Sequence, residues 1–588
     1  MKQIIILLVM LSAVLFIPAV IAQTEEPLHM TLLAVREEGD NFIGSTADLY
    51  LEIQEGKERV FLDTYPLTKI DTQISTRFAQ EIACNYFDIN CNNKDFIYTI
   101  RADSSIIGGP SAGASIAALT TAGLLGLPVD EDVAVTGTIN SGGLIGPVGG
   151  LKGKIEAAAA AGIGTVLIPF GTRFINESAN NTSTFDWGGN ADLIEYGRLL
   201  NITVVEVTDL NEVVDYVSGK RLLDDGASVV VDSEYSSIMR DVSEELCSRS
   251  GTLNKEVIGL LNKTEREDIS NTTAKAAAAA TERAYYSAAS YCFGLNINLH
   301  YLLYKKQNFS EAKIQSKATQ LSKDIERFEN EVRQKELRTI ADLQAFTVVL
   351  ERLNAAKEYI EKLENEEDKR FLLAIAEERF FSSQAWASFF EMDGRKYEFN
   401  KEVLQKSCTE KIQEAEERHQ YVQLFLSSGI GHIDDGIQQA MKHRDEEDYE
   451  QCLITASEAK ANANAILSTI GIESRQLRAL VDAKLHALEA QIFRTIEKRA
   501  FPLLGFSYYE YAQSLKNYDE ASALLYAEYA LEMSNLDIYF KEEQSGVEKL
   551  GDKISLELAL VFAAGAVVGA LLVALIYSKK PKRRKKAK

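Results

Sequence analysis

The chain is 588 residues long, which exceeds the size of one ordinary hydrophobic core, so roughly two or three folded units are expected. Hydrophobic residues make up 46% and charged residues 25% of the sequence, which is the balance of a globular protein. The formal net charge of -23 argues against a nucleic-acid partner, because contacts to phosphates need a basic surface.

The N-terminus is typical of a secretory signal peptide. Lys2 supplies a positive charge, and the run 4–17 is apolar and uncharged. Val20 and Ala22 occupy the small positions before a cleavage site, which predicts a signal peptide over residues 1–22. An uncleaved N-terminal anchor is the alternative, and either version exports the residues that follow.

Residues 28–218 are predicted to form a mixed α/β domain. Short alternating or apolar runs predict strands at 47–53, 133–135, 165–168 and 202–207. Helical patterns lie between these runs, at 111–125 and 151–161. Strands that alternate with helices indicate a sheet covered by helices.

The turn at the start of the helix 111–125 carries a candidate nucleophile. Ser111 follows Gly109 and Pro110 and precedes Ala112, so a glycine-rich turn presents its side chain at a helix N-terminus. Free N–H groups and the positive end of the helix dipole are found at such a terminus. An anionic tetrahedral intermediate on Ser111 would find hydrogen-bond donors there.

A serine nucleophile also needs a base, and the α/β region offers few candidates. Of the six histidines only His29 lies within it, so a Ser-His-Asp arrangement is poorly supplied. Lys154 lies between Leu151, Ile155 and an alanine-rich stretch, and desolvation there would populate its neutral amine. Taken singly, a helix-capping role for Ser111 and a solvated position for Lys154 are the simpler interpretations. Their occurrence together in one pattern favours catalysis.

The motifs of this region resemble the proteolytic domain of the Lon peptidase family. PSAG at 110–113 matches the nucleophile motif of the family, and GGLKGK at 149–154 matches the motif that ends in its catalytic lysine. Val-Thr-Gly at 135–137 and TVLIP at 165–169 match two further family segments. The resemblance covers nearly all of residues 30–215, with four elements in order at family spacing.

The resemblance implies a role for each matched residue. Ser111 takes the role of the nucleophile, Lys154 that of the base, and Thr136 the position from which a hydroxyl orients the amine. Two residues depart from the family pattern. Gly108 replaces an acidic residue three positions before the serine, and Thr138 replaces the glutamate expected after the Thr-Gly pair.

Residues 235–550 are predicted to be entirely helical. Glycine is scarce there, and apolar residues recur at three- and four-residue steps, as at Leu353, Ala356 and Ile360. An aromatic residue followed by a small one at a helix start resembles tetratricopeptide-like hairpins. This pattern stands at 308–312, 448–452 and 517–521. The copies are irregularly spaced, so an irregular helical bundle is the alternative.

The six cysteines are even in number, which agrees with a disulfide-bonded protein. Sequence separation favours the pairs Cys84 with Cys91, Cys247 with Cys292 and Cys408 with Cys452, and the other connectivities stay open. The cysteines lack the paired CxxC spacing of a zinc site. No metal and no cofactor is expected.

The C-terminus is predicted to anchor the chain in a membrane. Residues 556–577 are apolar except for Glu557, and at about 1.5 Å per residue they would cross a hydrocarbon core of about 30 Å. Residues 578–588 are strongly basic, which predicts a cytoplasmic tail by the positive-inside rule. The expected product is a single-pass protein of the cell membrane with its bulk outside the cytoplasm.

The motor module of Lon enzymes is missing, because the sequence holds no Walker A motif. The order of signal, peptidase domain, helical region and anchor is similar to that of secreted, membrane-anchored Lon-like serine proteases predicted in archaea. This resemblance implies an ATP-independent serine endopeptidase that cleaves unfolded or flexible polypeptides at the outer face of the membrane. A catalytically silent peptide-binding scaffold and a domain that processes only itself are the alternatives. Lon-type domains often form rings, so a homo-oligomer is left open.

Overall fold

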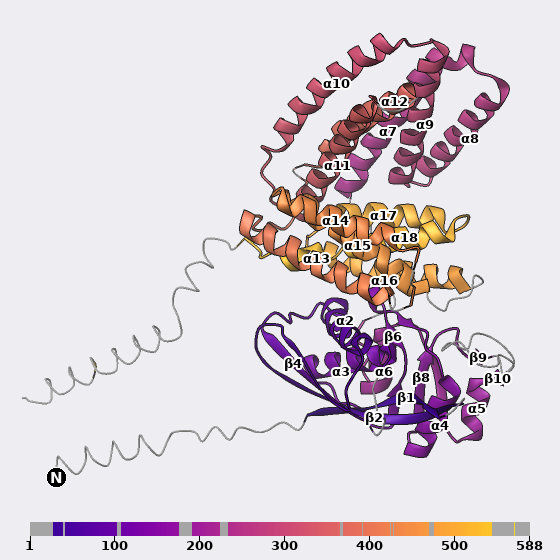
Figure 1. Cartoon of the computed structure of the whole chain (residues 1–588), viewed down its shortest axis with the longest axis vertical. Helices are drawn as coiled ribbons and strands as arrows, with labels where there is room; N and C mark the ends of the chain where they lie inside the picture. Colours follow the sequence, from indigo (N-terminus) through magenta and orange to yellow (C-terminus); the bar gives the residue numbers. More distant parts are fainter. Residues whose placement is uncertain are drawn as a thin grey trace, which may run out of the picture.

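The structure is a computed structural model that describes an α/β part followed by a long helical region (Figure 1). The described residues are 27–38, 41–102, 108–175, 191–223, 233–364, 368–390, 392–423, 425–426, 428–469, 476–543 and Ala570. The predicted order of a mixed α/β part and a helical region is confirmed.

A seven-stranded sheet forms the centre of the α/β part. Its strands, in spatial order, are β11 (Thr203–Val207), β8 (Thr165–Pro169), β5 (Val133–Val135), β1 (Leu28–Glu38), β2 (Asn41–Glu55), β4 (Lys94–Ala102) and β3 (Val60–Tyr65). β1 and β2 form a long antiparallel hairpin, and β4 continues the sheet antiparallel to β2. β5 runs parallel to β1, and β8 and β11 follow in the same direction.

Helices cover both faces of this sheet. One face carries α2 (Ile70–Tyr86), α3 (Gly113–Leu125) and α6 (Leu210–Ser218), and the other carries α4 (Leu151–Ala161) and α5 (Leu193–Leu199). Leu32 of β1 packs into the first core and Leu33 into the second, because successive strand residues point to opposite faces. The sheet therefore separates α3 from α4.

Short elements connect the sheet to these helices. They are η1 (Pro110–Ala112), β6 (Thr138–Ile139), η2 (Ser141–Gly143), β7 (Ile145–Gly146), β9 (Phe174–Ile175) and β10 (Ala191–Asp192). β6 and β7 pair antiparallel, so residues 138–146 form a small hairpin with η2 at its tip. We call this segment the 138–146 hairpin.

Glycines set the bounds of the two helices that carry the candidate site residues. α3 ends at Gly126, which has φ 61°, and α4 ends at Gly162, which has φ 80°. Both are left-handed conformations that cost glycine little and commonly close a helix. Gly150, with φ 69°, precedes α4 and turns the chain into it.

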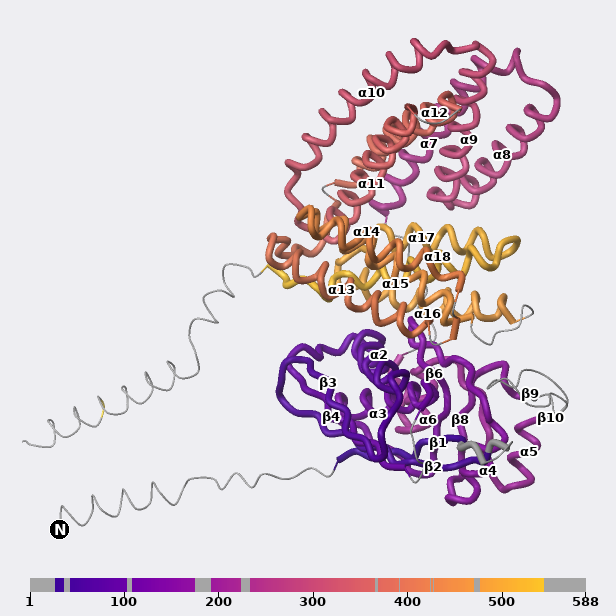
Figure 2. The backbone as a smooth tube through the Cα atoms, in the orientation of Figure 1, coloured from indigo at the N-terminus to yellow at the C-terminus, as the bar shows by residue number. Residues whose placement is uncertain are grey.

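The helical region consists of two tiers (Figure 1). The tier farther from the sheet contains α7 (Ser233–Val257), α8 (Lys263–Thr281), α9 (Tyr285–Lys306), α10 (Glu311–Val332), α11 (Ile340–Lys362) and α12 (Lys369–Trp386). The tier against the α/β part contains α13 (Lys401–Gln423), α14 (Gly431–Asp445), α15 (Tyr449–Thr469), α16 (Leu477–Glu497), α17 (Leu503–Leu515) and α18 (Glu520–Met533). The helical region also contains the short turns η3 (Ile258–Leu260), η4 (Ala387–Phe389) and η6 (Leu536–Tyr539). The chain reaches the far tier first and then returns (Figure 2).

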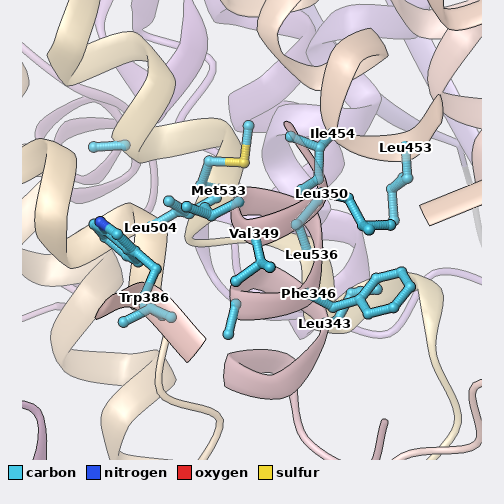
Figure 3. Packing of buried hydrophobic residues seen from close by; sticks show 14 of the residues in the cluster. Leu343, Phe346, Val349, Leu350, Trp386, Leu453, Ile454, Leu504, Met533 and Leu536 are labelled. Carbon is cyan, nitrogen blue, oxygen red and sulfur yellow. The ribbon is translucent and has the colours of Figure 1, made fainter. Parts of the chain in front are cut away.

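One apolar core joins the two tiers around α11. Leu343, Val349 and Leu350 of α11 are fully buried, and they lie among Leu453 of α15 and Leu504 of α17 (Figure 3). Burial of each such side chain contributes about 1.5–3 kcal/mol relative to exposure. The helical region is therefore one packed body across its two tiers.

The three segments that share an aromatic and a small residue lie at the starts of helices. They immediately precede or open α10, α15 and α18. Ser310 and Asp519 cap α10 and α18 by accepting hydrogen bonds from backbone N–H groups. A regular repeat array stays a prediction.

Three disulfides pair the cysteines as their sequence separation favoured. Cys84 is bonded to Cys91, Cys247 to Cys292 and Cys408 to Cys452. The first closes the turn after α2, the second joins α7 to α9, and the third joins α13 to α15. The disulfide pairing expected from the sequence is confirmed.

The predicted membrane anchor needs a correction. Within the described part of the chain, every helix is too short or too polar to cross a bilayer. Even α11, with its buried face, carries Glu351, Arg352 and Lys357. The predictions of a transmembrane helix over 556–577 and of a single-pass membrane localisation are therefore not supported and are withdrawn. Apart from Ala570, that segment, the signal peptide at 1–22 and the basic tail at 578–588 lie outside the described residues.

Candidate active site

Ser111 lies in η1, the single turn that precedes α3, and its turn is held by the first residues of α2. The N–H group of Gly109 donates a hydrogen bond to Oδ2 of Asp71 at 3.1 Å, and Thr72 Oγ1 donates to the Gly109 carbonyl at 3.4 Å. Gly109 has φ 104°, a conformation that L side chains rarely adopt. The glycine therefore allows the sharp turn that presents Ser111.

Backbone hydrogen bonds fasten this turn to the end of β5. The N–H group of Gly137 donates to the carbonyl of Ser111 at 3.0 Å, and the N–H group of Ala114 donates to the carbonyl of Gly137 at 3.0 Å. Pro110, Ser111 and Ala112 are partly buried. The nucleophile candidate and the Thr136-Gly137 dipeptide are thus fixed side by side.

Lys154 lies in the first turn of α4 and reaches the same dipeptide. Its side chain is buried, with 3% of the residue exposed, and its Nζ donates a hydrogen bond to Oγ1 of Thr136 at 2.9 Å. Thr136 is completely buried. Burial lowers the pKa of the Lys154 amine from its ordinary value of 10.5 to about 7.

The neighbouring lysine has a different environment. Lys152 Nζ lies over the ring of Tyr196 on α5, 5.1 Å from the ring centre. This arrangement agrees with the expectation that residues two positions apart on a helix point in different directions. Lys152 therefore points away from the side chains that contact Thr136.

The structure brings Ser111, Thr136 and Lys154 to one place without joining all three by hydrogen bonds. Among the described residues, no hydrogen bond links Lys154 Nζ to Ser111 Oγ. Ser111 is bonded to Gly137 through its carbonyl, and Lys154 to Thr136 through its amine. The dipeptide between them is the common point of attachment.

The N–H groups at the start of α3 are partly engaged. Gly113 donates to the Pro110 carbonyl and Ala114 donates to the Gly137 carbonyl. The oxyanion of a tetrahedral intermediate bound to Ser111 would need hydrogen bonds from other N–H groups of this turn. The expectation that an anionic intermediate finds hydrogen-bond donors at this helix N-terminus stays a prediction.

Asp71 is a site residue that sequence reasoning missed. It lies 38 residues before Gly109, and its carboxylate binds the turn whose own acidic residue is replaced by Gly108. An acidic residue in the first turn of a helix is a common stabilising feature, so Asp71 gives no signal of its own in the sequence. Only the packing of α2 against η1 reveals its contact.

Comparison with known proteins bears on this segment of the chain. Residues 93–177 match the Lon protease (S16) C-terminal proteolytic domain. Ser111, Thr136 and Lys154 all lie within this Lon-type segment.

Relatives of the Lon-type segment carry the same family name. The chain is 51% identical to the Archaeal Lon protease of Methanothermobacter thermautotrophicus over 63 residues, which are 11% of this chain and 10% of the relative. It is 33% identical to Lon protease 2 of Herpetosiphon aurantiacus over 132 residues, which are 22% of this chain and 14% of the relative. The chain spans about a tenth of the length of the curated relatives it matches. The family match itself covers residues 93–177.

Proposed function

We propose that this chain is a serine endopeptidase in which Ser111 is the nucleophile and Lys154 the general base. The match of residues 93–177 to the Lon proteolytic domain supports a serine protease. The observation that carries the dyad is the buried Lys154 amine, hydrogen-bonded to Thr136 and with a pKa lowered to about 7. A lysine in this state has a substantial neutral fraction near neutral pH, which a base requires.

In the proposed mechanism the amine moves one proton in each half of the reaction. Neutral Lys154 takes the proton of the Ser111 hydroxyl as Oγ attacks the peptide carbonyl, and the resulting ammonium later donates a proton to the leaving amine. Thr136 Oγ1, 2.9 Å from Lys154 Nζ, orients the amine throughout. In the second half, neutral Lys154 takes a proton from the water that attacks the acyl-enzyme and returns it to Ser111 Oγ as the acyl–oxygen bond breaks, which regenerates the hydroxyl.

The proposed substrates are unfolded or flexible polypeptides, cleaved without ATP. The sequence has no Walker A motif that would bind a nucleotide for forced unfolding. Two exposed apolar side chains, Leu67 at 80% and Ile70 at 56%, come shortly before Asp71, whose carboxylate accepts a hydrogen bond from the Ser111 turn. Exposed apolar surface of this kind commonly marks an interaction site, and an unfolded chain offers matching side chains.

The test is peptide cleavage by the purified full chain. A panel of fluorogenic peptides and casein is incubated with wild type, Ser111→Ala, Lys154→Ala and the matched control Lys152→Ala. We expect cleavage by wild type and by the Lys152 variant, and none above background by the other two. Equal cleavage by wild type and Ser111→Ala would contradict the proposal. A cleaved fragment of the chain itself, absent in Ser111→Ala, would restrict it to self-processing.

A catalytically silent peptide-binding module is the second candidate. It is favoured by the replacements at Gly108 and Thr138, which remove two acidic groups that the family pattern places around the site. A fluorophosphonate probe distinguishes the two, because it reacts with an activated serine. Labelling of wild type that is lost in Ser111→Ala and Lys154→Ala supports the peptidase. Peptide binding without labelling supports the silent module.

A further inference from the structure

The tip of the 138–146 hairpin is buried in the helical region. Ser141 is 5% exposed, and a side chain added at Gly142 would meet Leu531 of α18 and Ala487 of α16. Gly143 has φ 75° and lies against the ring of Tyr86, so a side chain at this position would collide with it. The hairpin thus inserts its tip between α2, α16 and α18.

A fully buried ion pair from the helical region binds this tip. Lys484 of α16 and Glu528 of α18 are both 0% exposed, and their Nζ and Oε1 atoms are 2.7 Å apart. Lys484 Nζ also donates to the carbonyl and to Oγ of Ser141, at 2.8 and 2.9 Å. Ser141 Oγ in turn donates to Oε2 of Glu528 at 2.5 Å, and Ser468 Oγ donates to Oε1 at 3.0 Å.

Stability alone is a weak reason for such a pair. Removing two charges from water is costly, and replacement of a buried ion pair by apolar residues of similar size is often neutral or stabilising. What an apolar pair could not supply is the set of directed hydrogen bonds to Ser141. The contact therefore fixes the position of the hairpin tip.

The hairpin connects directly to the candidate active site at both of its ends. Gly137 precedes it and donates a hydrogen bond to the carbonyl of Ser111. Within it, the backbone nitrogen of Ile139 lies 3.0 Å from the position that a side-chain carbon at Gly113 would occupy. After it, the chain runs through Gly150 into α4 and Lys154. A displaced tip would shift Thr136 relative to Ser111 and Lys154.

We propose that Lys484 and Glu528 are positioning residues for the Ser111, Thr136 and Lys154 site, acting through Ser141. The proposal rests on the proposed function for its catalytic consequence. On this proposal, the helical region holds the residues of the active site in position. The class of substrate is unchanged, and the two residues do not touch it.

The experiment separates positioning from stability with a pair of variants. Glu528→Gln removes one charge, and the double variant Lys484→Met, Glu528→Leu replaces the pair by apolar side chains. We expect both to lower kcat by about tenfold or more, since misplacement by ~1 Å can cost about a hundredfold, and to leave KM nearly unchanged. The double variant should regain thermal stability, because apolar replacements remove the buried charges.

The pH dependence of kcat is the readout that a purely structural role would not move. In wild type, kcat is expected to rise with pH as Lys154 loses its proton. Both Lys484/Glu528 variants should shift the pH at the midpoint of this rise, whereas the control Glu378→Gln should not. Glu378 is also 0% exposed and pairs with Arg249, at 2.7 Å, in the far tier. Wild-type kcat and midpoint in the double variant, or the same displacement in Glu378→Gln, would overturn the proposal.

Hydrogen exchange keeps this test independent of the proposed function. Amide exchange over residues 136–146, measured by mass spectrometry on the full chain, should accelerate in both Lys484/Glu528 variants and not in Glu378→Gln. If wild type shows no cleavage that depends on Ser111, the proposed function fails and exchange alone decides the positioning. Unchanged exchange in the double variant would then refute it. A Ser141→Ala variant, which retains the ion pair, provides a milder perturbation should Glu528→Gln fail to fold.

Discussion

At the scale of single residues, the environment of Lys154 determines what the site can do. Its hydrogen-bond partner is the neutral hydroxyl of Thr136 rather than a carboxylate, so burial is not offset by an opposite charge at that contact. The pKa of the amine therefore falls to about 7 instead of rising. Near neutral pH the amine alternates between the proton-accepting and the proton-donating form, as a base that later acts as an acid requires.

The rate of cleavage should follow the neutral form of Lys154. We expect kcat to rise with pH through a midpoint of about 7 and to level off above about pH 8.

Thr136→Val keeps the shape of the side chain but removes the hydroxyl that orients Lys154, so it should lower kcat by about tenfold to a hundredfold. Steady-state rates across pH 5 to 9 would check both, and a pH-independent kcat in wild type would count against the base role.

The same burial predicts how stability depends on pH. Below pH 7 both folded and unfolded chains hold the Lys154 proton, so the cost of burial is fully present. Between about pH 7 and 10.5 the unfolded chain binds a proton that the folded chain does not, so stability rises with pH. Lys154→Met lacks this cost, and its advantage in free energy of unfolding should shrink by about 1.4 kcal/mol per pH unit in that window. Denaturant unfolding at several pH values measures the difference.

At the scale of helices and strands, local pattern predicted the buried elements best. The predicted segments at 133–135 and 151–161 coincide with β5 and α4, because β5 is apolar throughout and α4 is rich in alanine and lies between Gly150 and Gly162. β2 runs over Asn41–Glu55, well beyond the predicted 47–53, since pairing with β1 and β4 satisfies the backbone of its polar ends. Such pairing comes from distant strands and leaves no local pattern.

For the candidate site, too, the sequence predicts residues in local motifs and not contacts between distant segments. Ser111, Thr136 and Lys154 lie in motifs that the sequence shows, and their placement around one dipeptide agrees with the predicted roles. Those roles stay a prediction. Asp71 and the Lys484–Glu528 pair could not be found, because their contacts join residues 38 to 387 positions apart. Periodicity and motif spacing do not encode tertiary contacts of this kind.

The tip of the 138–146 hairpin offers a test with two glycines of similar conformation. Gly143 has φ 75° and faces Tyr86, whereas Gly162 has φ 80° and open space where a side-chain carbon would lie. Both alanine variants carry a backbone cost of about 1 kcal/mol, and Gly143→Ala adds about 1–3 kcal/mol of overpacking. Thermal unfolding should show the larger loss in Gly143→Ala, accompanied by slower cleavage. Equal losses in the two variants would argue against close packing of the tip.

At the scale of the whole molecule, the chain order places its last helices against its first domain. The far tier of α7–α12 comes between them in sequence but not in space (Figure 1). Across the contact, Glu81 of α2 accepts hydrogen bonds from Arg418 of α13 at 2.9 Å and from Lys460 of α15 at 2.7 Å. Arg418 also lies over the ring of Phe78, 3.2 Å from its centre. These two cations are almost fully buried.

Removal of the Glu81 carboxylate should strongly destabilise the contact between the α/β part and the helical region. Glu81→Ala leaves Arg418 without its carboxylate and is expected to lower the free energy of unfolding by about 3 kcal/mol. Arg77 and Glu417 form an ion pair across the same contact at 3.3 Å, and Arg77 is largely exposed. Arg77→Ala should therefore cost less than about 1 kcal/mol. Chemical denaturation of the full chain compares the two, and similar losses would mean that water reaches the Glu81 contact.

The distance in sequence between Ser141 and Glu528 has a consequence for how the protein is made. These residues are 387 positions apart, so a ribosome completes Ser111 and Lys154 long before it reaches Glu528. At about 5–20 residues per second the interval is roughly 20–80 s. Throughout translation of the helices, the hairpin lacks the residues that hold its tip. On the proposed function and the proposed positioning role, full activity is expected only when synthesis of the chain is nearly finished.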